Sequence, residues 1–282
     1  MADPRLYQIG VLASLLVYGM TQLEFGITVP RACLLLLTAL ATQTICDWMT
    51  SSRSPLGQVV VNVKSALISG LSLCLLLRTN RAELAILAAV LTIAGKFLLR
   101  FRGKHLFNPT NGGLVAMLLL SDQVWVSPGQ WGSAAFSAFL VACAGGLVVN
   151  RASRSDVTYA FIAFYCTLLL GRSFYLGEPM GIPVHRLESG ALLLFTFFMI
   201  SDPKTTPDSR AGRVLFAGLV AVGAWYVQFR LFRTNGMLWS LAVCAMAVPL
   251  IDWLLPNSRY SWPSRGSAAM RTELATVERR TA

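Results

Sequence analysis

Long apolar runs, separated by short polar or basic segments, recur along most of this chain. Runs of this kind are typical of membrane helices, and the pattern predicts ten of them. Their expected bounds are 6–22, 27–46, 59–77, 82–101, 109–120, 133–149, 157–170, 190–200, 214–227 and 237–254. The fifth and eighth runs are too short to cross ~30 Å of hydrocarbon as helices that rise ~1.5 Å per residue. We expect both to be half-helices or broken spans buried in protein, because unpaired backbone amides find no partner in lipid.

Similar sequences occur at corresponding places in the two halves of the chain. "SGLSLCLLLRTN" from Ser69 matches "SGALLLFTFFMISDP" from Ser189 at an offset of 120, and the Asn-Gly pair at Asn111 matches the pair at Asn235 at an offset of 124. Five spans in each half would reverse the second copy across the bilayer and produce an inverted-topology repeat. The alternative is chance, because Ser-Gly and Asn-Gly are common at helix starts.

The predicted fold class is an all-α polytopic membrane protein with about ten transmembrane helices in two inverted five-helix repeats that contain short broken helices. We expect a single membrane domain over residues 1–256, with repeat one at about 6–122 and repeat two at about 133–255. The polar segment 257–282 is expected to follow as a mobile C-terminal tail.

Composition supports a membrane location and indicates an orientation. Hydrophobic residues make up 55% of the chain and charged residues 13%. Lys and Arg residues assigned to the two membrane faces number 15 on the side of the N-terminus, tail included, and 7 on the other side. This bias predicts a multi-pass protein of the bacterial cytoplasmic membrane with both termini in the cytoplasm. The net charge of +11 is then explained by basic loops and the lipid bilayer, and no nucleic-acid partner is expected.

Metal and hydrolytic chemistry are both disfavoured. The six cysteines lie in or beside apolar runs without a CxxC pair, and the only histidines are His105 and His185. We interpret the cysteines as small hydrophobic residues and expect no metal site, although a cluster held by cysteines of separate helices stays open. No nucleophile with a base, carboxylate pair or phosphate-cradling Walker loop is found, so no catalytic residue is assigned.

A polar segment, "HLFNPTNGG", stands where a membrane helix should begin. Asn108 can cap that helix with its side-chain oxygen, Pro109 suits the first helical position, and Gly112 leaves the backbone open to close approach. The result would be an inward-facing helix N-terminus that favours an anionic or hydrogen-bonding ligand. The alternative is a capped re-entrant helix whose polar groups satisfy one another.

A second polar segment, "SDPKTTP", follows the short eighth run. Asp202, Thr205 and Thr206 could donate and accept hydrogen bonds to a ring system or an ion, and Lys204 could meet a phosphate or carboxylate. A plain helix stop is the alternative. Two lysines within predicted spans, at positions 64 and 96, either reach toward the membrane interface or face an internal polar cavity.

The two segments "FNPTNGGLVAMLLLSD" and "FMISDPKTTPDSRAG" resemble the RnfD/NqrB family of membrane subunits of redox complexes. The similarity extends over roughly 59–255, and the chain also resembles stand-alone members associated with enediyne biosynthesis. The resemblance implies ten spans in inverted repeats of urea-transporter-like architecture, and it implies bound flavin. In the family, one FMN is joined to the threonine of an S-G-A-T motif. Here Leu192 stands at that place, so the resemblance implies riboflavin or FMN held noncovalently.

Two functions remain open. One is a flavin-binding protein for transmembrane electron transfer, with other redox-complex subunits or a homo-oligomer as partners. The other is a transporter or channel for a small polar solute or natural product. The candidate cofactor-binding residues are Phe107, Asn108, Thr110, Asn111, Gly112, Ser189, Gly190, Asp202, Lys204, Thr205, Thr206 and Asn235.

Overall fold

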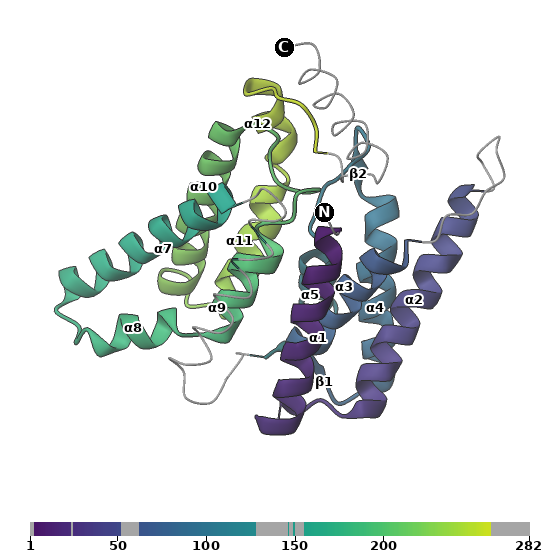
Figure 1. Ribbon diagram of the computed structural model, residues 1–282. Coiled ribbons are helices and arrows are strands. Elements are labelled where there is room, and N and C mark those ends of the chain that lie inside the picture. The colour runs from purple at the N-terminus through teal and green to yellow at the C-terminus, as the bar shows by residue number, and fades with distance from the viewer. Residues whose placement is uncertain are drawn as a thin grey trace, which may run out of the picture.

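The computed structural model describes residues 3–23, 25–51, 62–127, 146, 149 and 155–260, and helices dominate it (Figure 1). The helices are α1 (Pro4–Gln22), α2 (Val29–Ser51), α3 (Val63–Leu76), α4 (Ala82–Leu98), α5 (Pro109–Leu120), α7 (Ser155–Leu176), α8 (Gly181–Leu187), α9 (Gly190–Leu194), η1 (Phe195–Met199), α10 (Arg210–Phe229), α11 (Gly236–Ala245) and α12 (Val248–Leu254). The strands are β1 (Leu77–Thr79), β2 (Arg100–Phe101), β3 (Lys104–His105) and β4 (Val124–Val126).

Helices α1 to α5 form one group, and α7 to α12 form a second group beside it (Figure 1). In the first group α2 packs against α3 and α4, α4 against α5, and α1 against α3. Strands β1 and β4 pair in antiparallel fashion at one end, with Leu77 opposite Val126. At the other end the β2–β3 hairpin turns the chain from α4 into α5 (Figure 1). The group is therefore closed at both ends by short strand pairs.

The second group is organised around α10, which packs against both α7 and α11. Its core contains three of the largest fully buried side chains, Phe161, Phe195 and Phe216. The rings of Phe161 and Phe195 lie 5.2 Å apart in a tilted arrangement that aromatic pairs prefer. This packing holds η1, a single π-helical turn that continues α9, against α7.

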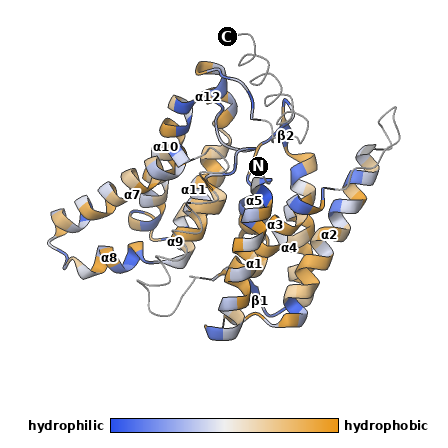
Figure 2. Ribbon diagram, in the orientation of Figure 1, coloured by the Kyte–Doolittle hydropathy of each residue, from blue (hydrophilic) through white to orange (hydrophobic). Residues whose placement is uncertain are grey.

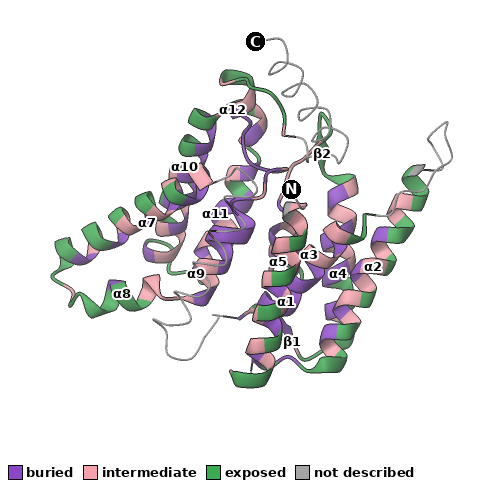
Figure 3. Cartoon of the chain, viewed as in Figure 1, coloured by how far each residue is buried: buried purple, intermediate pink, exposed green. Residues whose placement is uncertain are grey.

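The two groups meet at the short helices α5 and α11, which pack against each other. Asn111 Nδ2 donates a hydrogen bond to the carbonyl oxygen of Leu238 at 3.2 Å, so the first turns of the two helices are joined. In Figure 3 the helices in the middle of the molecule carry most of the buried surface, while the outer faces are exposed.

Glycines allow two helix pairs to approach closely. A Cβ atom built on Gly113 of α5 would lie 1.8 Å from Thr92 Oγ1 of α4, and one on Gly223 of α10 would lie 2.3 Å from Ser240 Oγ of α11. In both pairs a glycine of one helix therefore faces a threonine or a serine of the other helix. At Gly113 the Cα atom of Thr92 would also lie within 3.0 Å, so only glycine fits there while the helices keep their spacing, whereas a side chain at Gly223 would first displace the hydroxyl of Ser240.

The outer surface of the helices is apolar, as expected for a protein that faces lipid (Figure 2). Leu98, Leu119, Phe174 and Trp253 are all more than two-thirds exposed. Three described helices are long and apolar enough to cross a membrane, at 29–50, 155–176 and 210–229, and the bent pair α11–α12 would make a fourth. The chain is thus an all-α protein with the features of an integral membrane protein.

Several predicted spans correspond to observed helices, with differences at their ends. The short runs at 109–120 and 190–200 are confirmed as short apolar helices. The expected span 237–254 is two helices with a 50° bend between them, and the expected span 82–101 ends at Leu98 because the chain turns there into a hairpin. The expected span 133–149 lies outside the described residues apart from 146 and 149.

Candidate functional site

A cavity of about 340 Å³ opens between the two helix groups. This volume is at the lower end of the range for small-molecule sites, roughly 300–1,000 Å³. Its polar lining consists of Arg5, Gln8, Asn62, Ser65, Ser69, Ser72, Lys96, Arg100, His105, Asn108, Thr110, Ser201, Asp202 and Lys204. Its apolar lining includes Ile68, Pro109, Val149, Phe197, Phe198, Met199 and Pro203.

The start of α5 forms one side of this cavity. Asn108 caps the helix, since its Oδ1 accepts a hydrogen bond from the backbone N–H of Asn111 at 3.1 Å, and Pro109 occupies the first helical position. The Asn108 amide also donates to the carbonyl oxygen of Met199 and to Asp202 Oδ2, both at 3.3 Å. One side chain therefore starts α5 and links it to the segment that follows η1.

A stripe of serines on α3 forms a second wall. Ser65, Ser69 and Ser72 are spaced by four and three residues, which places them on one face of the helix. Ser69 and Ser72 are buried in the protein. Their hydroxyls give the wall donors and acceptors without charge.

Cationic groups are concentrated around the cavity. Lys96 is buried and donates from Nζ to Gln43 Oε1 at 2.6 Å and to Ser65 Oγ at 3.0 Å. It therefore faces internal polar groups and does not reach toward the membrane interface. Lys204 Nζ makes a long hydrogen bond of 3.5 Å to the carbonyl oxygen of Tyr260. An ammonium group has three donors, so Lys204 keeps hydrogen-bonding capacity for a ligand.

Two titratable groups outside the helices, His105 and Asp202, affect the net charge of the cavity. Burial lowers the pKa of His105 to about 4, with Arg100 contributing, so the imidazole is neutral at pH 7. Burial also raises the pKa of the Asp202 carboxyl, although the N–H of Lys204 donates to it at 3.0 Å. Asp202 is the acidic residue among those that line the described cavity, and the cationic groups outnumber it. The site therefore favours an anion.

The third wall is aromatic. Phe197, Phe198 and Met199 belong to the π-helical turn η1, and all three line the cavity. Single π-helical turns within helices are rare and are frequent at functional sites. Here the π-helical turn contributes two phenylalanines and a methionine to a cavity that the serines of α3 also line.

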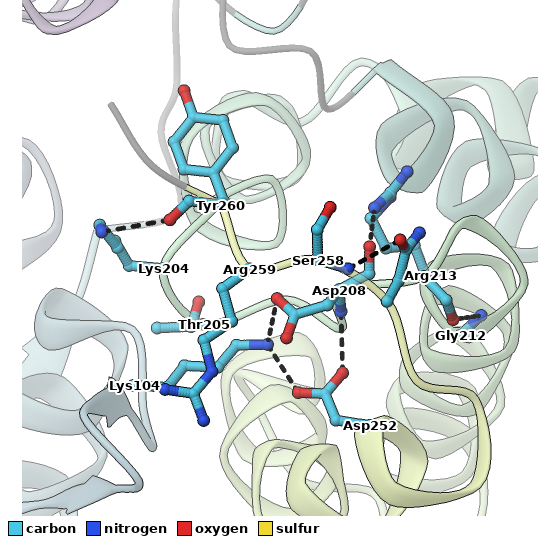
Figure 4. Close-up of polar contacts among 12 residues, drawn as sticks. Lys104, Lys204, Thr205, Asp208, Gly212, Arg213, Asp252, Ser258, Arg259 and Tyr260 are labelled. Carbon is cyan, nitrogen blue, oxygen red and sulfur yellow. Dashed lines mark hydrogen bonds and ion pairs between the residues drawn. The ribbon is translucent and has the colours of Figure 1, made fainter. Parts of the chain in front are cut away.

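A buried ion cluster lies beside the cavity and joins the two helix groups (Figure 4). Lys104 of β3 contacts Asp208 at 3.1 Å and Asp252 of α12 at 2.7 Å. The backbone N–H of Asp208 also donates to Asp252 Oδ1 at 2.8 Å. We call Lys104, Asp208 and Asp252 the lysine clamp, because it holds the β2–β3 hairpin against the second group.

The structure brings together only part of the sequence-predicted site. Asn108, Thr110, Asp202 and Lys204 line the cavity. The other predicted residues do not line the cavity. Five of them are neighbours of the lining residues in the chain, namely Phe107, Asn111, Gly112, Thr205 and Thr206, and the remaining three are Ser189, Gly190 and Asn235. Ser189 and Gly190 stand at the start of α9, whereas the cavity is lined by η1 and the segment after it, at the other end of the same short helix.

Asn111 and Asn235 occupy different positions relative to their helices. Asn111 is the third residue of α5, and its Oδ1 is buried without a hydrogen-bond partner in the described part of the chain. Asn235 precedes α11 in the left-handed conformation, with a φ of 59°, and its side chain makes no capping hydrogen bond. The Nδ2 contact with Leu238 makes Asn111 a link between helices α5 and α11.

Several cavity residues were not singled out from the sequence. Arg5, Arg100 and Ser65 carry no motif, Ser69 and Ser72 were noted only as part of the repeated segment "SGLSLCLLLRTN", and the π-helical turn has the composition of an ordinary apolar helix. The serine spacing of four and three residues within an apolar run was the signal that could have revealed the polar face of α3.

The chain matches a known family of proteins. The model of the NQR2, RnfD, RnfE family matches residues 120–261, which is half of the chain. The chain belongs to this family. Its match begins at the end of α5 and continues through α12, so the family signature covers the second helix group and the segments after η1.

Relatives of the RnfD type show the same relationship at low identity. The D component of the ion-translocating oxidoreductase complex of Escherichia coli (strain K12) is 27% identical over 112 residues, 39% of this chain and 32% of that protein. The Erwinia tasmaniensis protein of the same name is 29% identical over 155 residues, 52% of this chain and 38% of that protein, and the Citrobacter koseri protein is 30% identical over 108 residues, 38% of this chain and 31% of that protein. The chain therefore matches about a third of the length of these curated relatives.

Proposed function

We propose that this RnfD/NqrB-family protein is a membrane subunit for transmembrane electron transfer that holds FMN noncovalently in the cavity at Asn108. The observation that carries the proposal is the lining of that cavity. It combines a surplus of cationic side chains, a row of serine hydroxyls and the side chains of Phe197 and Phe198 at the junction of the two helix groups.

The residues present fit such a cofactor in two respects and exclude covalent attachment at one place. Lys204 and Arg100 are suited to a phosphate, and Phe197 and Phe198 to an apolar ring system. Leu192, by contrast, has no hydroxyl that could be esterified, and it is buried. Bound FMN would supply reversible electron transfer, while the protein would orient the ring and exclude water.

The family name also supports partners and an architecture. The relatives are named as subunits of an ion-translocating oxidoreductase complex, and we propose redox-complex subunits or a second copy as partners. We further propose ten spans in two inverted repeats, with the termini in the cytoplasm of a bacterial cell. The similar packing of α4 against α5 and of α10 against α11 supports the repeat.

The first test is a comparison of FMN with riboflavin, which lacks the phosphate. Purified wild-type protein should be yellow and should bind FMN more tightly than riboflavin. Lys204→Gln should weaken FMN binding roughly ten- to hundredfold and leave riboflavin binding almost unchanged, because the loss of one charge-assisted hydrogen bond costs ~1.5–3 kcal/mol. Flavin fluorescence titration would measure both affinities.

Lys64→Gln is the matched control for this titration. Lys64 is half-exposed, pairs with Asp3 and does not line the cavity, so its removal should leave FMN affinity unchanged. A colourless protein that binds neither flavin would contradict the proposal. Equal loss of both flavins in Lys204→Gln would mean that Lys204 does not contact the phosphate.

The mode of attachment gives a separate prediction. Flavin bound to the native protein should be released completely by denaturation, because position 192 is leucine. The denatured polypeptide should show no flavin fluorescence on a gel. Substitution Leu192→Thr restores the hydroxyl of the S-G-A-T pattern and is the informative companion variant. A fluorescent wild-type band would show that another residue carries the flavin.

A transporter or channel for a small polar solute is the second candidate function. The position of the cavity between two helix groups that meet at short helices favours it, since substrates of inverted-repeat transporters bind at such a junction. A colourless protein that binds an uncharged polar solute in this cavity would decide for the transporter.

A further inference from the structure

We propose that a second cavity, at the β1 end of the first helix group, binds a phosphate group. The cavity has a volume of about 200 Å³, and Thr28, Arg31, Arg78, Thr79 and Asn80 contribute its polar lining. It lies at the end of the group closed by β1 and β4, whereas the cavity at Asn108 lies beside the β2–β3 hairpin (Figure 1). The two sites are therefore separate.

Arg78 provides the main evidence. Its side chain is more than nine-tenths buried, and Nε donates to the carbonyl oxygen of Phe25 while Nη1 donates to the carbonyls of Cys74 and Leu77. Nη2 is buried and has no hydrogen-bond partner in the described structure. A buried guanidinium that keeps an unused donor is costly unless a ligand satisfies it.

A second cation, Arg31, and the N-terminus of helix α2 also favour an anion in this cavity. Arg31 is half-buried, and its two terminal nitrogens donate to the carbonyls of Arg81 at 2.9 Å and Asn80 at 3.2 Å. Helix α2 begins at Val29, next to Thr28 in the lining. Pro30 has no N–H and the N–H of Ala32 donates to the Thr28 carbonyl, so Val29 and Arg31 carry the first-turn amides that have no intrahelical partner. The positive end of a 23-residue helix adds to the two guanidinium groups.

The charge balance selects an anion with several acceptor oxygens. No aspartate or glutamate occurs among the described residues that line this cavity. The neighbouring carboxylate, Glu83, is paired with Arg81, and both side chains are more than half exposed. Phosphate oxygens match the fork of donors that arginine presents, so a phosphate group suits a cavity lined by two arginines.

The phosphate could belong to an anionic lipid headgroup or to a phosphate in solution. Thr28, beside the start of a predicted membrane helix, is exposed and lines the cavity, so the cavity is accessible to both. The chemistry recognised is the same in each case, and the source is decided by experiment.

The test uses the full-length protein with inorganic phosphate and, in a second arm, nanodiscs of phosphatidylglycerol or of phosphatidylcholine. Phosphate binding to lipid-depleted protein is measured by calorimetry, and retained lipid by native mass spectrometry. Arg31→Gln should weaken binding roughly tenfold or more, because it removes one charged contact. Arg81→Gln is the matched control, since it removes one arginine charge from the neighbouring β1–α4 loop, and Arg81 does not line the cavity.

Arg78→Lys provides a second variant that keeps a charge beside the carbonyls at the end of α3 while removing the free Nη2 donor. Binding of inorganic phosphate that is lost in Arg31→Gln and Arg78→Lys would support a site for soluble phosphate. Selective retention of phosphatidylglycerol with the same variant pattern would support a lipid headgroup site. Absence of both ligands from the wild type, or equal loss in Arg81→Gln, would overturn the proposal.

Discussion

Lys104→Met is expected to destabilise the protein by about 3–5 kcal/mol, because it leaves two carboxylates facing each other without their shared cation. The side chains of the lysine clamp are largely buried, with exposed fractions of 14% for Lys104, 8% for Asp208 and 20% for Asp252. Thermal and denaturant unfolding in detergent would measure the loss. Flavin, if bound, should also dissociate faster, because the clamp holds the β2–β3 hairpin next to the cavity.

Two further variants isolate the cause of this loss. Adding Asp208→Asn and Asp252→Asn to Lys104→Met should recover much of the stability, since the uncompensated charges are then removed. Arg81→Gln breaks an exposed ion pair with Glu83, where at most ~1 kcal/mol is expected. If Lys104→Met unfolded at the same temperature as the wild type, the clamp would have no structural role.

Gly113→Ala should be the second strongly destabilising substitution, at about 3 kcal/mol. The new methyl group would lie 1.8 Å from Thr92 Oγ1 and 3.0 Å from Thr92 Cα, so α4 and α5 would have to separate. Overpacking of this kind costs typically ~1–3 kcal/mol, and contact with backbone atoms places this position at the upper end. The unfolding midpoint is again the measurement.

Gly95→Ala in α4 is the matched control, because nothing lies within 4 Å of the atom that it adds. Alanine is the better helix former by ~0.5–1 kcal/mol, so this variant should be at least as stable as the wild type. Glycine-to-alanine substitution would then lower stability at one position of this helix pair and not at the other. Equal destabilisation by both substitutions would contradict overpacking against Thr92 as the cause, because Gly95 has open space where the methyl group is added.

The start of α5 was predictable because all of its determinants are local. Asn108 as the cap and Pro109 at the first helical position follow from neighbouring residues in the chain, and the structure has both. The bend between α11 and α12 was not predictable from hydropathy, because the apolar composition continues across it. Similarly, "SGAL" and "SDPK" are near each other in the sequence, yet a short helix holds them at opposite ends.

The sequence by itself determined the membrane character, the short helices and the family, since hydropathy and short motifs are properties of contiguous residues. Tertiary structure alone decided which polar groups share a cavity. Asn108 reaches Asp202 across 94 positions of the chain, and Lys104 reaches Asp252 across 148. Such pairings depend on how the helix groups pack, and packing is set by the shape of whole helix faces, including the glycines at positions 113 and 223. No local pattern records that shape, so the lysine clamp and the buried guanidinium of Arg78 emerged only when the helices were in place.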